Sequence, residues 1–118
     1  MGAPVVRWQI ISPNPDKVSA FYSKVFGWTV SQGNAMGYRE LKTGSAEGIQ
    51  GGVWPAPPEA NTFVQLFVQV DDVAATITHV ESAGGSVIVP RTALPDGEVM
   101  AILRDPTGAS FGVVQPAA

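Results

Sequence analysis

The stretch that decides the fold is "VVRWQIISPNPDKVSAFYSKVFGW", residues 5–28, because a diverged copy follows as "FVQLFVQVDDVAATITHVESAGG", residues 63–85. Each copy starts with an alternating, strand-like run and continues with apolar residues at helical spacing. The ungapped alignment that places Arg7 on Gln65 also pairs Ile10 with Val68, Asn14 with Asp72 and Gly27 with Gly85. A correspondence of this length indicates that the chain is a duplication of one module.

Helix boundaries can be predicted in both copies. In the first copy Asn14 is a suitable N-cap, Pro15 is suited to the first helical position and Gly27 ends the helix. In the second copy Asp71 or Asp72 can cap the helix. The expected core-facing apolar residues are Val18, Phe21, Tyr22, Val25 and Phe26 in the first helix, and Val73, Ile77 and Val80 in the second.

Further strands follow each helix. Segments "WTVSQ" (residues 28–32), "GYRELKTG" and "GIQGGVW" complete the first copy, and "SVIVP", "EVMAILRDPTG" and "ASFGVVQ" complete the second. We therefore predict an α+β fold of two paired βαβββ modules that form a curved mixed sheet around a concave cleft. Residues 1–118 form one domain, with module one at 4–54, a linker at 55–61 and module two at 62–116.

Composition excludes several classes of function. Only 14% of the 118 residues are charged and the formal net charge is −3, which argues against nucleic acid and acidic membrane surfaces as partners. No apolar run approaches the roughly 20 residues that a membrane helix needs, and no signal-peptide pattern is present. We expect a cytoplasmic protein.

The inventory of metal-binding and nucleophilic side chains is short. The chain has no cysteine and a single histidine, His79. Disulfides, cysteine-ligated zinc and any site that needs two histidines from one chain are therefore excluded. His79 lies off the apolar stripe of its helix, so we expect it to be exposed and not catalytic.

Strand alternation sorts the candidate ligand-binding residues. Val6, Trp8 and Ile10 are expected to face the first helix, and Val64, Leu66, Val68 and Val70 the second. The opposite face then carries Arg7, Gln9 and Ile11 in the first module and Phe63, Gln65, Phe67 and Gln69 in the second. Polar side chains interleaved with phenylalanine are typical of a pocket lining.

The paired modules, with "AFYSKVFGW", "VDDVAATITHVESAGG" and the closing "RDPTGASFGVV", resemble the vicinal oxygen chelate superfamily of glyoxalase I, bleomycin-resistance proteins and extradiol dioxygenases. The resemblance covers almost the whole chain. In metal-dependent members it implies ligands from the first, fourth, fifth and eighth strands, on the face away from the helices. These positions fall on Arg7, on Gln50 or Gly51, on Gln65 and on Gly112.

This set of residues is unsuited to a metal ion, because arginine is a cation without a free lone pair and neutral amides are weak ligands. We therefore predict no metal and no cofactor. Gly112 is open to two interpretations. Its missing side chain can leave space on the floor of the cleft, or it can relieve the curvature of a bent strand.

The predicted ligand-binding residues are Arg7, Gln9, Gln50, Trp54, Gln65, Phe67 and Gly112. Structural alternatives stay open for most of them. Arg7 can form an ion pair with Glu40 or Glu98, the two glutamines Gln9 and Gln65 can bond each other, and the aromatic residues can serve packing alone. No catalytic residue can be named.

The leading functional hypothesis is the binding of a small polar or aromatic molecule in the cleft without a metal. A metal-dependent lyase or isomerase of the glyoxalase type is the first alternative, and it requires Glu40, Glu47 or Glu98 to point inward. A metal-free enzyme that uses Tyr38 or a buried glutamate as acid or base is the second. A homodimer is expected, since assembly can cover open sheet edges.

Overall fold

The computed structural model describes residues 2–31 and 36–118 of the chain. Residues 7–65 form one compact unit, here called the N-terminal unit, and residues 1–6 and 66–118 form the second, the C-terminal unit. The elements are β1 (Val5–Ser12), α1 (Pro15–Phe26), β2 (Thr29–Val30), β3 (Arg39–Lys42), β4 (Gln50–Pro55), β5 (Phe63–Gln69), α2 (Val73–Ser82), β6 (Ser86–Ala93), β7 (Val99–Arg104) and β8 (Ser110–Gln115). The predicted α+β class and the βαβββ order of both modules are confirmed. The end of the strand expected over residues 28–32 lies outside the described residues.

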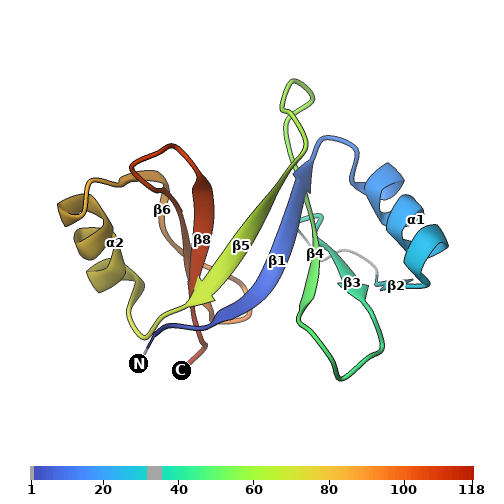
Figure 1. The fold of residues 1–118 in the computed structure, drawn as a ribbon, viewed down its shortest axis with the longest axis horizontal. Coiled ribbons are helices and arrows are strands. Elements are labelled where there is room, and N and C mark those ends of the chain that lie inside the picture. Colours follow the sequence, from blue (N-terminus) through green and yellow to red (C-terminus); the bar gives the residue numbers. More distant parts are fainter. Residues whose placement is uncertain (1, 32–35) are drawn as a thin grey trace. The chain divides into compact units, whose positions relative to one another are not determined.

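The N-terminal unit has the strand order β2-β3-β4-β1. Strand β1 runs parallel to β4, and β3 is antiparallel to both β2 and β4. Helix α1 packs against β2, β3 and β4 (Figure 1). The chain passes from β1 through α1 before it returns to the same sheet, so the helix covers one face of the sheet. No helix among the described residues of this unit covers the opposite face.

The core of the N-terminal unit lies between α1 and the sheet. Ile10, Leu41 and Val53 are buried there, and Trp8, Val18, Tyr22, Trp28 and Val30 pack around them. The Trp28 ring connects the helix to the sheet, with centroid distances of 5.5 Å to Tyr22 and 5.4 Å to Trp8. Trp8 and Ile10 thus face the helix, as strand alternation predicted.

The prediction of a five-residue buried stripe on α1 was wrong in part. Val18 and Tyr22 reach the core, whereas Phe21, Val25 and Phe26 are each more than half exposed. The helix has more apolar surface than the short strands beneath it can cover. The predicted N-cap also differs, since Asn14 occupies the cap position but its side chain makes no cap hydrogen bond. Gly27 ends the helix with a φ of 73°, which explains a glycine at this position.

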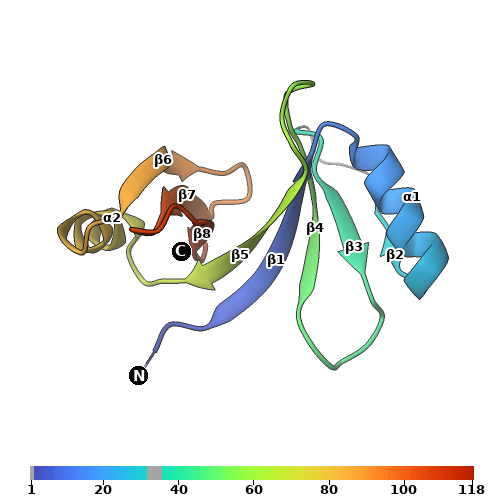
Figure 2. The same cartoon turned by 45° about the horizontal axis from the view of Figure 1, so that its top comes forward.

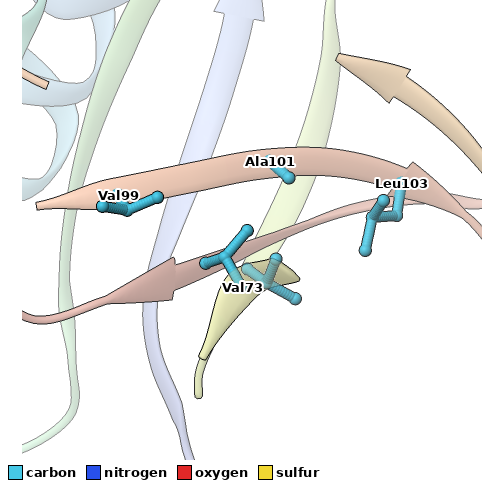
Figure 3. Close-up of a cluster of buried hydrophobic side chains, with 5 residues drawn as sticks. Val73, Val99, Ala101 and Leu103 are labelled. Atoms are coloured by element: carbon cyan, nitrogen blue, oxygen red, sulfur yellow. The ribbon is translucent and has the colours of Figure 1, made fainter. Parts of the chain in front are cut away.

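The C-terminal unit repeats the pattern with the strand order β5-β8-β7-β6. Strand β5 runs parallel to β8, and β7 is antiparallel to both β8 and β6. Helix α2 packs against β6, β7 and β8 (Figure 2). Val73 of the helix and Val99, Ala101 and Leu103 of β7 form the centre of the core (Figure 3).

Strand β5 is only partly covered by α2. Val68 and Val70 pack against the core of the C-terminal unit, as predicted. Val64 and Leu66, which we expected in the same buried row, are exposed. The helix is ten residues long, and its contacts are with β6, β7 and β8. Apolar side chains in the first half of β5 are therefore exposed.

No helix in the described part of the chain is long and apolar enough to cross a membrane.

Side-chain acceptors fix two turns of the C-terminal unit. Asp72 caps α2 by accepting a hydrogen bond of 3.1 Å from the Ala75 N–H. In the turn between β7 and β8 the Asp105 carboxylate accepts bonds from the Thr107 N–H, the Thr107 hydroxyl and the Ala109 N–H. These donors, led by the Thr107 hydroxyl, hold the pKa of Asp105 below its ordinary value of 3.8.

Asp105→Asn provides a test of this turn through pH. A lowered pKa in the folded state means that the carboxylate stabilises the protein above its ordinary pKa, and that this contribution is lost as the pH falls. The melting temperature of the wild type should exceed that of Asp105→Asn at pH 6, and the difference should narrow towards about pH 3. A difference that stays constant over this range would show that ionisation of Asp105 is irrelevant to folding.

Candidate functional site

The face of the N-terminal unit opposite α1, here called the helix-free face, is built from alternate residues of β1, β3 and β4. The parallel register of β1 and β4 sets Arg7 beside Gln50, Gln9 beside Gly52 and Ile11 beside Trp54. Strand β3 adds Glu40, which pairs with Gly52 from the other side. Four of the predicted ligand-binding residues, Arg7, Gln9, Gln50 and Trp54, are thus on one face of one sheet.

An aromatic pair covers part of this face. The Tyr38 and Trp54 rings lie 4.8 Å apart with their planes inclined by 38°. The Tyr38 ring also extends over Gly52, where a Cβ atom would collide with the hydroxyl end of the ring. The Cβ atom would also collide with the Arg39 carbonyl oxygen, so the ring and the backbone of β3 together require a glycine at position 52. From the sequence, Tyr38 was expected only as an acid or base. Its contact with Gly52 depends on the register of β3 against β4, which no local pattern indicates.

Gln9 is the buried polar group at the centre of the helix-free face. Its side chain is 1% exposed, and its Oε1 atom has no hydrogen-bond partner among the described residues. A buried acceptor without a partner typically costs about 1–3 kcal/mol. Gln9 Oε1 therefore accepts no hydrogen bond from Gln65, and the predicted bonding between the two glutamines stays a prediction for their other amide atoms.

Gln50 uses its amide locally. Its Oε1 accepts from the Thr43 N–H at 2.9 Å and its Nε2 donates to the Thr43 hydroxyl at 3.1 Å, so the side chain holds the loop that precedes β4. Gly51, the other residue considered for the fourth-strand position, faces α1, and a side chain there would collide with the Trp8 ring. Gly51 is thus excluded from the helix-free face.

The remaining predicted residues of this unit are Arg7, Gln65 and two glutamates. Arg7 is half-buried and Gln65 is 4% exposed. Glu40, one of the two predicted partners of Arg7, has its carboxylate 3.5 Å from the Lys42 ammonium. Glu47 is exposed in the loop before β4.

The corresponding face of the C-terminal unit contains Phe67 and Gly112. Gly112 lies between Phe67 of β5 and Ile102 of β7. The Phe67 side chain is 4% exposed, and a Cβ atom at Gly112 would collide with the far edge of its ring. The interpretation of Gly112 as open floor space was therefore wrong, because the Phe67 ring fills that space. The glycine allows the Phe67 ring to approach the backbone of β8 closely. Phe67 therefore has a packing role in this unit.

His79 is exposed on α2, as predicted. With Asp71, Asp72, Ala75 and Thr76 it lines an open hollow of about 270 Å³ at the start of the helix. Within residues 2–31 and 36–118 no three His, Cys, Asp or Glu side chains form a group that could hold a metal ion. This hollow is a surface feature of α2, and none of the predicted ligand-binding residues lines it.

Comparison with known proteins identifies the family. Residues 5–113 match the model of the glyoxalase, bleomycin resistance protein and dioxygenase superfamily. The chain belongs to this superfamily. Proteins of Mycobacterium bovis and Mycobacterium tuberculosis named "Putative glyoxylase CFP32" are 36% identical to it over 112 residues. That match covers 92% of this chain but 42% of those proteins, which are thus more than twice as long.

Solved structures confirm the glyoxalase-like fold. The methylmalonyl-CoA epimerase of M. tuberculosis superposes with a TM-score of 0.61 and 18% identity, covering 97% of this chain and 88% of the epimerase. A hypothetical protein from Bacillus halodurans gives a TM-score of 0.70 with 12% identity, covering 100% of this chain and 97% of its own. At these identities the comparison establishes the fold and leaves the chemistry to the site residues.

The metal positions implied for superfamily enzymes can be tested against this member. They hold a guanidinium at Arg7, an amide bonded to Thr43 at Gln50, a buried neutral amide at Gln65 and no side chain at Gly112. A divalent cation requires carboxylate, imidazole or thiolate donors, and arginine repels it. These residues do not fit a divalent metal ion.

The ring contact at Gly112 gives a direct test of the register on which these placements depend. Gly112→Ala should destabilise the protein by about 1–3 kcal/mol in chemical denaturation, because the new methyl group displaces a well-packed ring. In a Phe67→Ala background the same substitution should cost much less, since the ring is gone.

The double-mutant cycle distinguishes this contact from a general intolerance of β8. If Gly112→Ala costs the same with and without the Phe67 ring, the close approach of Phe67 is not the reason for the glycine.

Proposed function

We propose that this superfamily member binds a small polar or aromatic molecule on the helix-free face of its N-terminal unit, without a resident metal. The observation that carries the proposal is the chemistry of the superfamily's metal positions, where Arg7, Gln50 and Gln65 replace anionic or imidazole donors. The aromatic pair of Tyr38 and Trp54 lies on the same face. A few hydrogen-bonding groups beside an aromatic wall suit an organic ligand better than a cation.

Each residue has a role in this proposal. The Arg7 guanidinium can bind a carboxylate or phosphate through two parallel hydrogen bonds. Gln65 can bond a carbonyl or amide group, and Trp54, which is partly exposed, offers a surface for stacking. Gln50 acts indirectly through Thr43, by fixing the loop beside Arg7. Phe67 and Gly112 pack against each other within the C-terminal unit and have no direct part in this proposal.

A metal-dependent lyase or isomerase of the glyoxalase type is the second candidate. The name of the mycobacterial relatives, which share 36% of the aligned residues, favours it. Metal analysis of the purified protein separates the two candidates. We expect well below one zinc, nickel or manganese ion per chain, whereas one tightly held ion per chain would support the enzyme and contradict the proposed metal-free binding.

Arg7→Ala tests ligand binding itself. The ligand can be recovered by mass spectrometry of small molecules released from the denatured wild-type protein. We expect an anionic or carbonyl-bearing compound, and its affinity should fall about tenfold or more in Arg7→Ala, because a hydrogen bond to a charged group contributes about 1.5–3 kcal/mol. Lys17→Ala, on the exposed surface of α1, is the matched loss of positive charge and should leave affinity unchanged. Equal affinity of wild type and Arg7→Ala, measured calorimetrically, would remove Arg7 from the site.

We also propose that the protein forms a homodimer. Phe21, Val25 and Phe26 leave an apolar surface on α1 that a second copy can cover. Sedimentation velocity at micromolar concentration should give about twice the chain mass of 12.3 kDa. Phe26→Lys should shift the protein towards the monomer, while Lys24→Ala on the same helix should not. A wild type that sediments only as a monomer would contradict the proposal.

A further inference from the structure

The internal repeat shows that a polar group at position 9 is unnecessary for packing. The alignment that places Arg7 on Gln65 places Gln9 on Phe67. Both residues lie at the same point of their sheets, each paired with a glycine of the adjacent parallel strand, Gly52 or Gly112. In the C-terminal unit an apolar ring fills this position and is 4% exposed. The N-terminal unit instead buries an amide, at a cost in stability that an apolar residue would avoid.

The unsatisfied atom specifies what it can bind. Gln9 Oε1 is a hydrogen-bond acceptor, fully buried and without a partner in the described chain. Only a donor, an N–H or O–H group, can satisfy it. Because buried polar groups in folded proteins are nearly always bonded, an exception of this kind calls for a donor beyond those that residues 2–31 and 36–118 supply.

The residues around Gln9 within its unit indicate the shape of a molecule that could bring an N–H or O–H donor to Oε1. Its strand neighbour Gly52 has no side chain, and the surface above Gly52 accommodates an aromatic ring, as the position of Tyr38 shows. The Trp54 ring lies next to Tyr38, and the residue is partly exposed. A planar molecule can therefore take the place of the Tyr38 ring on Gly52 while stacking on Trp54.

We propose that the helix-free face recognises a planar aromatic molecule with an N–H or O–H donor, which bonds Gln9 Oε1 and stacks on Trp54 after displacing the Tyr38 ring from Gly52. This inference rests on the proposed function and narrows its ligand class. Offset stacking on Trp54 provides affinity, and the single donor provides selectivity. An isosteric molecule without the donor would leave Oε1 unsatisfied and should bind more weakly.

Indole and 1-methylindole are matched probes for this site, since they share the ring system and differ in the donor. Binding can be followed by the Trp54 side-chain N–H signal in two-dimensional NMR, assigned with Trp54→Phe. Wild-type protein should bind indole at least about fivefold more tightly than 1-methylindole, the selectivity expected from one buried hydrogen bond. Gln9→Met should reduce this ratio to about one, and Gln69→Met, the same change at an exposed residue of β5, should preserve it.

Stability supplies an independent readout. Gln9→Met keeps the length of the side chain and removes the unsatisfied acceptor, so the free energy of unfolding should be unchanged or higher. A clear loss of stability would show that the amide serves the fold, and would overturn the inference.

The binding outcomes separate this inference from the proposed function. Equal binding of the two probes to wild-type protein, a comparison that needs no variant, would remove Gln9 from recognition. If the released ligand still depends on Arg7 in that case, the proposed function stands and only its narrowed ligand class fails. If neither probe moves the Trp54 signal, the aromatic part of the site is wrong as well.

Discussion

The close approach of an aromatic ring to a strand glycine is the contact on which the helix-free faces of both units depend. Tyr38 covers Gly52 in the N-terminal unit and Phe67 covers Gly112 in the C-terminal unit. The two glycines occupy equivalent points of the repeat, opposite Gln9 and Phe67. A side chain at either glycine would force the ring away, so the bare backbone and the ring form one packing unit. The ring comes from the residue before β3 in the N-terminal unit and from β5 in the C-terminal unit.

This packing bears on the chemistry of the superfamily. In this chain Gly112 and the Phe67 ring occupy the surface at a position where the superfamily resemblance implies a metal ligand, and Gln50 is bonded to its neighbouring loop. A guanidinium can bind anions, and a neutral amide can bond carbonyls through its N–H groups and hydrogen-bond donors through its oxygen. The protein thus combines the fold of a family that includes metal enzymes with side chains appropriate to organic ligands. A shared fold does not determine the chemistry of a site, and in this chain the fold is that of a family with metal enzymes while the side chains at the metal positions do not suit a metal ion.

The faces covered by the helices are packed by apolar side chains, unlike the polar and aromatic helix-free faces. Both cores are small and almost entirely apolar, with Leu41 and Leu103 fully buried at their centres. Helix α1, however, presents apolar residues on two sides. Val18 and Tyr22 pack against the core, and Phe26 stacks on Trp28 at a centroid distance of 5.3 Å. Phe21, Val25 and Phe26 form a surface whose apolar area exceeds what the unit itself can bury. Apolar surface of this kind is commonly covered by another protein surface, which agrees with the proposed dimer.

The sequence alone determined the duplication, the order of elements and the face assignment of β1. These features follow from periodicity and capping residues, which are local, so "VVRWQIIS" and the Asp72 cap could be read directly. The repeat also allowed Arg7, Gln9 and Gln65 to be placed on the face opposite the helices. The same local reasoning overestimated the burial of α1 and β5, because periodicity identifies an apolar stripe but not how much of it a short sheet can cover.

Only the tertiary structure decided what the candidate site residues do. Whether Gly112 opens space or receives a ring depends on the register of β5 against β8, and Gly51 and Gly52 exchange faces with a register shift of one residue. The unsatisfied Gln9 Oε1 and the bonded Gln50 amide have the same chemical formula and were indistinguishable in the sequence. Their difference is the Thr43 hydroxyl 3.1 Å from the Gln50 Nε2 atom, a contact that depends on how the loop between β3 and β4 folds and that no periodic pattern indicates.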